Sequence, residues 1–167
     1  MELPLSIEKC VALVAQCFTL ATSSKSKRRA CGALLVCVRE DGVPVVISSG
    51  INGTAPGADN ACEPPCLTYT FGHVVHAEPN CLANFDSDFV FTDRHILFVS
   101  DSPCPHCFKI IAERGIKHVV FGRGYRIQEH LTDEVLALHG MTLTQVDMQN
   151  VIQYLSNTVT RIEQVIC

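Results

Sequence analysis

Two short apolar runs, with a helical pattern between them, limit the possible folds of this sequence more than any other feature. The runs are HILFVS (residues 95–100) and HVVFG (residues 118–122), and both are rich in β-branched and aromatic residues, which favour strands. Residues 104–114 between them have the apolar spacing of a helix, and Gly115 stops that pattern. The alternation of strand and helix predicts an α/β protein.

The same alternation continues over the rest of the chain. Residues 7–21 predict an opening amphipathic helix, and residues 31–50 predict a β-hairpin that turns at Asp41 and Gly42. Further helices are expected at residues 76–85, 128–139 and 148–166, with a short strand at residues 141–146. We therefore expect one domain, residues 1–167, with a three-layer α/β/α fold in which a mixed sheet of about five strands has helices on both faces.

The charge and the apolar content of the chain argue against several classes of function. The net charge of −4 argues against a large positive surface of the kind that binds long nucleic acids. A basic run, SKSKRR (residues 24–29), could contact one phosphate, although such runs are more often exposed loops. No apolar segment approaches the ~18 residues of a membrane span and no signal peptide is recognisable, so we expect a cytoplasmic protein without a membrane partner.

The chain has ten cysteines among its 167 residues, which is a high number. In a sequence with no secretory leader, cysteines are better explained as core thiols and metal ligands than as disulfides. Four of them occupy apolar positions of the predicted helices and strands and are expected to pack in the core: Cys10, Cys17, Cys37 and Cys81.

Cys104 and Cys107 form a Cys-x-x-Cys pair, preceded by Pro103, where a predicted strand meets a predicted helix. Taken alone, this spacing suits a zinc site and a thioredoxin-like redox pair equally well. His76 favours zinc, because one histidine and two cysteines leave the fourth position of a tetrahedral ion open, as in catalytic sites. Residues 79–102 leave room for one helix and one buried strand, so we expect the two helix starts to lie side by side at one edge of the sheet.

Glu78 lies two residues after His76 in the first turn of a predicted helix, where Pro79 is tolerated because its missing N–H would have no helical partner. A carboxylate beside a catalytic zinc can take a proton from an attacking water and pass it to a ring nitrogen. A glutamate at this position can also serve only to stabilise the helix dipole. The three nearby metal ligands favour the catalytic role.

Together, HAE (residues 76–78) and PCPHC (residues 103–107) match the H-x-E…P-C-x-x-C signature of the zinc deaminases. Further stretches resemble the deoxycytidylate (dCMP) deaminases in particular: SSGINGTAPGADNACE (residues 48–63), RACGALLV (residues 29–36) and RHILFVSDSPCPHCFKIIAERGIKHVVFGRGYR (residues 94–126). The resemblance covers residues 6–146. It implies a cytidine deaminase-like fold and the hydrolytic deamination of dCMP to dUMP, a precursor of thymidylate, and it is compatible with a phage-encoded enzyme.

The resemblance also implies roles for individual residues. His76, Cys104 and Cys107 would bind the catalytic zinc, and Glu78 would transfer the proton. The implied substrate-binding residues are Asn52, Ala77, Asn80, Ser102 and Tyr125. Some family members hold a second, structural zinc near the loop of residues 51–72, and the candidate ligands for it here are Cys31, Cys62, Cys66 and His73. Ordinary cysteines and a surface histidine would explain these four residues equally well.

Several functions remain open at this point. The same site could act on a C5-modified dCMP, on dCTP, on a cytosine nucleoside, or on tRNA or single-stranded DNA, and the chain could also be a non-catalytic zinc module. The resemblance further implies dCTP and dTTP as effectors and a homo-oligomer, commonly a hexamer, in the cytoplasm of the cell or of a phage's host. Residues 148–166 lie outside the resemblance, and they are apolar enough on one face to pack on the core or on a neighbour.

Overall fold

The computed structural model describes residues 3–86, 88–125 and 133–166. Helices and strands alternate along these residues as the sequence predicts. In chain order they are α1 (Ile7–Ala21), β1 (Gly32–Val38), β2 (Pro44–Ile51), α2 (Ala77–Leu82), β3 (His95–Asp101), α3 (Pro105–Glu113), β4 (His118–Arg123), α4 (Asp133–Leu138), β5 (Thr142–Gln145) and α5 (Met148–Ile166).

The strands form one mixed sheet of five strands in the order β2-β1-β3-β4-β5. β1 pairs antiparallel with both β2 and β3, whereas β3, β4 and β5 run parallel to one another. The central strand β3 is buried along its whole length, which explains why its sequence is a continuous apolar run rather than an alternating one. The prediction of a mixed sheet of about five strands is confirmed.

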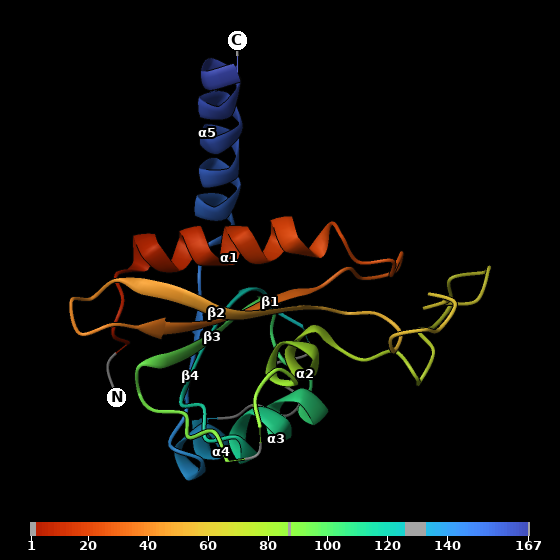
Figure 1. Ribbon diagram of the computed structural model, residues 1–167, viewed down its shortest axis with the longest axis horizontal. Coiled ribbons are helices and arrows are strands. Elements are labelled where there is room, and N and C mark those ends of the chain that lie inside the picture. Colours follow the sequence, from red (N-terminus) through yellow and green to blue (C-terminus); the bar gives the residue numbers. More distant parts are fainter. Residues whose placement is uncertain (1–2, 87, 126–132, 167) are drawn as a thin grey trace.

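Helices cover both faces of the sheet, so the predicted three-layer arrangement is also confirmed (Figure 1). On one face, α1 packs through Val14 and Cys17 against Leu34, Phe98 and Val120 of the strands. On the other face lie α2 and α3, whose buried residues meet side chains from β1, β3 and β4. The two cores are separated only by the thickness of the sheet.

Two glycines allow helices to approach the sheet unusually closely. A Cβ atom at Gly50 of β2 would lie 2.4 Å from the carbonyl oxygen of Ala77 and 2.4 Å from the amide nitrogen of Cys81, both in α2. A Cβ atom at Gly32 of β1 would lie 2.2 Å from the carbonyl oxygen of Cys17 in α1. Because backbone atoms cannot move aside as flexible side chains can, glycine at position 50 fixes where α2 lies on the sheet.

Some predicted boundaries are wrong. The helix expected at residues 76–85 has only six residues, Ala77–Leu82, because Asn84 has left the helix and donates a hydrogen bond from its side chain to Ser48 Oγ (2.8 Å). The helix expected at residues 128–139 is observed as Asp133–Leu138, and residues 128–132 lie outside the described part of the chain.

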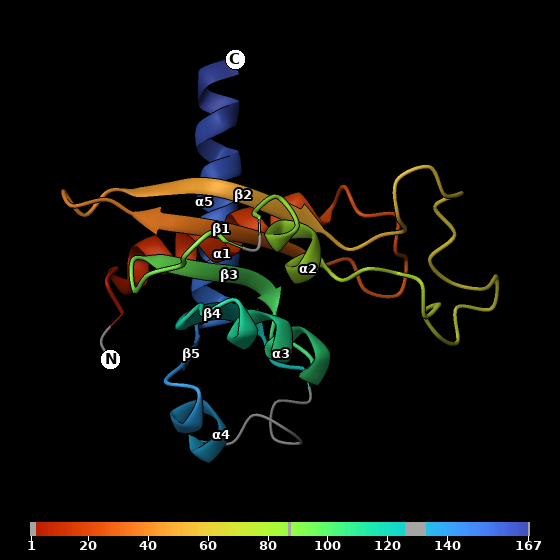
Figure 2. The same cartoon turned by 60° about the horizontal axis from the view of Figure 1, so that its bottom comes forward.

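The last helix, α5, leaves the sheet and extends away from the rest of the protein, with the C-terminus at its tip (Figures 1 and 2). Figure 2 also shows the long connection between β2 and α2, which extends to one side of the sheet. Within the described residues, no helix combines the length and the apolar character needed to cross a membrane.

Candidate active site

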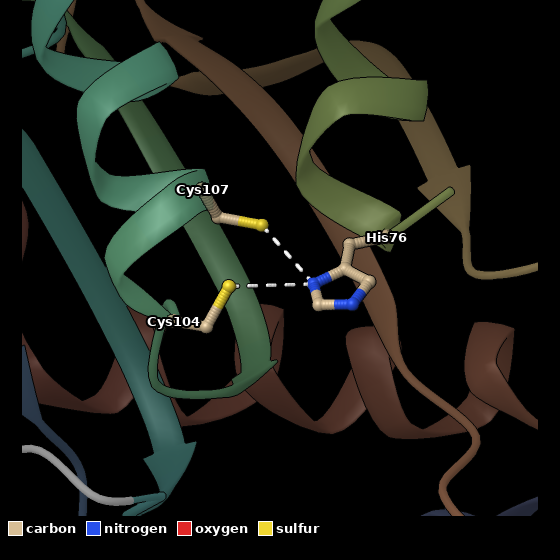
Figure 3. A group of neighbouring side chains, drawn as sticks. All are labelled: His76, Cys104 and Cys107. Atoms are coloured by element: carbon tan, nitrogen blue, oxygen red, sulfur yellow. Dashed lines mark hydrogen bonds between the residues drawn. The ribbon is translucent and has the colours of Figure 1, made fainter. Parts of the chain in front are cut away.

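His76, Cys104 and Cys107 lie together at the starts of two neighbouring helices (Figure 3). His76 is the N-cap residue of α2, Cys104 is the N-cap residue of α3, and Cys107 is in the first turn of α3. The Nδ1 atom of His76 is 3.2 Å from Cys107 Sγ and 3.5 Å from Cys104 Sγ. Among the described residues, this is the one group of three or more potential ligands whose donor atoms all lie within 4.8 Å of one another.

The electrostatics of this cluster favour a thiolate at Cys104. Hydrogen bonds from the Cys107 thiol and from His76 lower the pKa of the Cys104 thiol far below its usual value. The hydrogen bond to Cys104 and the negative charges of Cys104 and Glu78 raise the pKa of His76 despite its partial burial. Thiolate and imidazole are the donors that zinc prefers, so the cluster has the chemistry of a zinc site.

Glu78 lies beside the cluster but is not one of its ligands. Its side chain is in the first turn of α2 and is only 7% exposed. Burial raises the pKa of Glu78 to about 7, although its own backbone N–H and the nearby His76 act in the opposite direction. A carboxyl group that titrates near neutral pH can both accept and return a proton.

A cavity of about 380 Å³ opens directly above these groups. Its floor includes His76, Glu78 and Cys104, and its walls come from the start of β1, the end of β3 and the residue after β2. Arg28, Tyr69 and Thr70, all from connecting segments, also line it. The volume is within the range of small-molecule sites.

Four of the five predicted substrate-binding residues line this cavity, namely Asn52, Ala77, Ser102 and Tyr125. Asn80 is not among the lining residues, because its side-chain amide donates a hydrogen bond to the Ile51 carbonyl (2.7 Å) and so attaches α2 to the end of β2. Ser102 Oγ accepts a hydrogen bond from the Tyr125 amide (2.7 Å), which holds Tyr125 in the wall.

Asn52 uses both ends of its side chain within the protein. Its Oδ1 accepts hydrogen bonds from the Cys31 amide and from Ser24 Oγ, each 2.8 Å long, and its Nδ2 donates to the Arg29 carbonyl (2.8 Å). The side chain therefore joins the segment after β2 to the segment before β1. This contribution to the wall of the cavity was not part of the sequence-based expectation.

The sequence analysis also missed the carboxylate of Asp101, which is at the end of β3 and lines the cavity. Arg29 Nε donates to one of its oxygens and an Arg123 Nη donates to the other, each at 2.9 Å. Burial alone would raise the pKa of Asp101, but the two arginines outweigh it and lower that pKa. The available signals were an aspartate directly after a strongly apolar run, Arg29 in SKSKRR and Arg123 after the next strand, but no local pattern connects them.

The four candidate ligands of a second zinc are not brought together. Cys31 Sγ contacts Asp101 (3.5 Å), Cys66 Sγ contacts Thr68 Oγ1 (3.2 Å), and a ring nitrogen of His73 contacts the Ala61 carbonyl (3.2 Å). Cys62 is buried elsewhere in the loop. The structure therefore gives no support to a metal at these residues.

The long connection is instead attached by Glu63. The carboxylate of Glu63 accepts hydrogen bonds from Ser26 Oγ and from the backbone amides of Lys27 and Arg28. Closer to α2, Gly53 and Val75 form a backbone bridge across the connection. These hydrogen bonds hold the connection against the basic segment.

A sheet with helices on both faces, a His-x-Glu at the start of one helix and a Cys pair at the start of the next are the features of the zinc-dependent deaminases. Residues 7–123 match the family model described as "Cytidine and deoxycytidylate deaminase zinc-binding region". The chain belongs to this family.

Individual relatives agree with this assignment. The chain is similar to the crystal structure of dCMP deaminase from the cyanophage S-TIM5 in complex with dCMP and dUMP, with 30% identity and a TM-score of 0.65 over 80% of this chain and 93% of that one. It is 29% identical to ComE operon protein 2 of Bacillus subtilis over 86% of this chain and 74% of that protein. It is also 32% identical to deoxycytidylate deaminase of Schizosaccharomyces pombe, over 60% of this chain but only 34% of that protein.

Proposed function

We propose that this protein is a zinc-dependent deaminase that hydrolyses dCMP to dUMP and ammonia. The observation that carries the proposal is the position of Glu78, a buried carboxyl group with a pKa of about 7 on the floor of a cavity, beside a His-Cys-Cys cluster. The similarity to a cyanophage enzyme that was crystallised with dCMP and dUMP supports the choice of substrate.

His76, Cys104 and Cys107 would hold the zinc ion. The donor set fits zinc, because two sulfurs and one imidazole nitrogen lie within 4.8 Å of one another, and His76 and Cys104 also line the cavity. Zinc bound there supplies a nucleophile at neutral pH by lowering the pKa of a water molecule.

Glu78 would carry the protons of the reaction. It takes a proton from the water that attacks C4 of the cytosine ring, and it delivers that proton to N3. It then takes the remaining proton from the hydroxyl group now on C4 and transfers it to the amino group; the C4–N bond breaks as the C4=O bond forms, so the products are dUMP and ammonia. A carboxyl group with a pKa of about 7 suits this role, since it exchanges protons readily in both directions at neutral pH.

The rest of the cavity would bind the nucleotide. Ala77 at the start of α2 and Tyr125 in the wall are placed beside the floor, where the base would lie. Arg29 already pairs with Asp101, whereas Arg28 is exposed, and the one hydrogen bond of its guanidinium to a described residue is a long one to Thr70 Oγ1 (3.5 Å). Arg28 is therefore the guanidinium best placed to meet the 5′-phosphate.

Two other functions are less well supported. Deamination of a long nucleic acid is disfavoured by the net charge of −4, because no large positive surface is available for a polymer. A non-catalytic zinc module would have no use for a buried Glu78 next to the cluster. Activity on C5-modified dCMP, on dCTP or on a nucleoside, regulation by dCTP and dTTP, a homo-oligomeric state and a cytoplasmic location remain predictions from the family resemblance.

The test compares ammonia release from dCMP, dCTP, deoxycytidine and a cytosine-containing oligonucleotide with the zinc-loaded protein. A preference for dCMP is expected, and release from the oligonucleotide alone would contradict the proposal. Arg28→Ala should raise the KM for dCMP at least tenfold and leave the kinetics with deoxycytidine unchanged. Lys27→Ala is the matched control, because Lys27 is in the same segment but does not line the cavity.

A further inference from the structure

The helix α5 has an apolar stripe that is covered only near its beginning. In its first two turns, Met148, Val151 and Leu155 face the core formed with α1 and the sheet, and Val151 is fully buried. The later turns of the helix extend past α1 and out of the body of the protein (Figure 1). The stripe that anchors α5 thus continues onto a part of the helix whose apolar side chains are at least half exposed, among them Val159, Ile162 and Ile166.

The uncovered part of the stripe consists of large apolar side chains. Ile152 is 52% exposed, Val159 is 54% exposed, Ile162 is 50% exposed and Ile166 is 77% exposed. An exposed row of this kind on one helix is unusual on a monomer, because single exposed apolar residues are normally scattered. Its continuity with the core-facing stripe indicates that the row has a partner.

The spacing of the stripe identifies the kind of partner. Its members follow one another at alternating intervals of four and three residues: Met148, Ile152, Leu155, Val159, Ile162 and Ile166. This is the heptad repeat of a coiled coil, with Ile152, Val159 and Ile166 at the a positions and Met148, Leu155 and Ile162 at the d positions. β-Branched residues at a with leucine at d favour two parallel strands, whereas isoleucine at d, as at Ile162, favours more; we take two copies, the smallest number that covers the stripe.

We propose that two copies of this chain associate through a parallel, two-stranded coiled coil of their α5 helices. Covering the exposed stripes of two copies would remove on the order of 1,000 Å² of surface from water, which is about the least that a specific interface needs. α5 is already folded and anchored on its own core, so pairing does not have to nucleate the helix.

The residues that flank the stripe are compatible with this pairing. In a parallel coil the g position of one helix faces the e position of the other, and here Thr158 would face Glu163 of the second copy, so no like charges meet. A membrane surface is a poorer partner for the stripe. Amphipathic helices that bind membranes carry many basic residues on their polar face, whereas Arg161 is the one basic residue of α5. The second copy is therefore the occupant that best fits the charges.

The experiment measures molar mass by sedimentation velocity for the full chain and for variants at Val159. Val159→Glu and Val159→Lys each place charges at the centre of the coil and should halve the mass of the wild-type assembly. Mixing the two variants in equal amounts should restore the mass, because a glutamate and a lysine then face each other. Asn157→Glu and Asn157→Lys are the controls, since Asn157 is on the opposite side of the helix and exposed.

A wild-type chain that is monomeric at every concentration would overturn the proposal, and so would Val159 variants with unchanged mass. A monomeric wild type that sediments with vesicles of anionic phospholipid would assign the stripe to a membrane instead. Circular dichroism and zinc content should match the wild type in all variants, because position 159 lies outside the core. The mass is measured without substrate, so the result does not depend on which reaction the protein catalyses.

Discussion

Arg29 and Asp101 form an ion pair across 72 positions of the sequence, and the Arg29 guanidinium also lies 4.2 Å from the centre of the Tyr125 ring. The pair joins the segment before β1 to the end of β3, and Arg123 binds the other oxygen of the same carboxylate. Asp101 thereby sets the positions of Arg29 and Tyr125 in the wall of the cavity. Because both of its oxygens are engaged by arginines, we expect Asp101 to act as a positioning residue for this wall.

Asp101→Asn should raise the KM for dCMP more than it lowers kcat, because the wall of the cavity shifts while Glu78 and the metal ligands stay in place. It should also lower the free energy of unfolding by about 1–3 kcal/mol, since two charge-assisted hydrogen bonds are weakened. Steady-state kinetics and urea unfolding measure both effects. Glu40→Gln is the control, because the Arg94–Glu40 pair is exposed and such pairs contribute little. An unchanged KM would refute the positioning role.

Glu78→Gln should lower kcat by ~10²–10⁴-fold, because glutamine keeps the shape of the side chain but cannot carry a proton. Bound zinc, measured by atomic absorption, should stay equimolar with the chain, since Glu78 is not among the clustered ligands. The exposed Glu113→Gln on α3 serves as the control. Loss of zinc from the Glu78 variant would show that this residue holds the metal rather than the proton.

Gly50→Ala should lower both zinc affinity and kcat. The new Cβ would meet backbone atoms of α2 at 2.4 Å, so the helix that follows His76 and contains Glu78 has to move. We expect a loss of about 1–3 kcal/mol of stability, as for other overpacked sites. Gly72→Ala is the matched control, because a Cβ there would have no neighbour within 4 Å. If both variants bound zinc equally well, the close approach at Gly50 would not be what positions the site.

The contributions of His118 and His95 to stability should fall as the pH drops below about 6.5, the ordinary pKa of histidine, whereas Glu78 and His76, whose pKa values are raised, act in the opposite direction. Burial lowers the pKa of His118 and of His95, so below this pH the unfolded chain binds protons that the folded chain does not. Each histidine can contribute a slope of up to about 1.4 kcal/mol per pH unit until the pH reaches its lowered folded-state pKa.

His118 is the better of the two to test, because it is fully buried and its Nε2 has no hydrogen-bond partner among the described residues. His118→Gln should be less stable at pH 7.5 but should lose less stability between pH 7.5 and 5.5 than the wild type does. The exposed His139→Gln should keep the wild-type slope. Parallel slopes for all three proteins would mean that another group controls the acid sensitivity.

The parts of this protein that could be predicted from the sequence are those that depend on neighbouring residues in the chain. The continuous apolar run of β3, the helix that stops at Gly115 and the two ligand motifs are local patterns, and each has the expected structure. The convergence of the motifs was also predictable, because each one lies at a helix start next to the same sheet.

What escaped prediction depends on contacts between distant segments. The Asp101 carboxylate meets Arg29 and Arg123 only after the sheet has formed. Asn80 was expected in the substrate site, but its amide faces β2. The spacing of Cys62, Cys66 and His73 resembles that of a metal site, yet in a loop without periodic structure spacing does not determine where side chains point.

The two helix starts that hold His76 and Cys104 also have a consequence for the topology of the chain. These residues are 28 positions apart, and the segment between them contains the central strand β3. None of the described cysteines forms a disulfide, so these residues have no covalent cross-link of that kind. An ion bound to both His76 and Cys104 would cross-link the chain at these two positions and close the segment between them into a ring. By analogy with a covalent cross-link of similar span, such a closure stabilises a fold by about 3 kcal/mol or more. The metal site would thus serve the reaction and also cross-link the fold. Loss of the ion would lower the stability of the segment that contains β3, whose end forms part of the cavity wall.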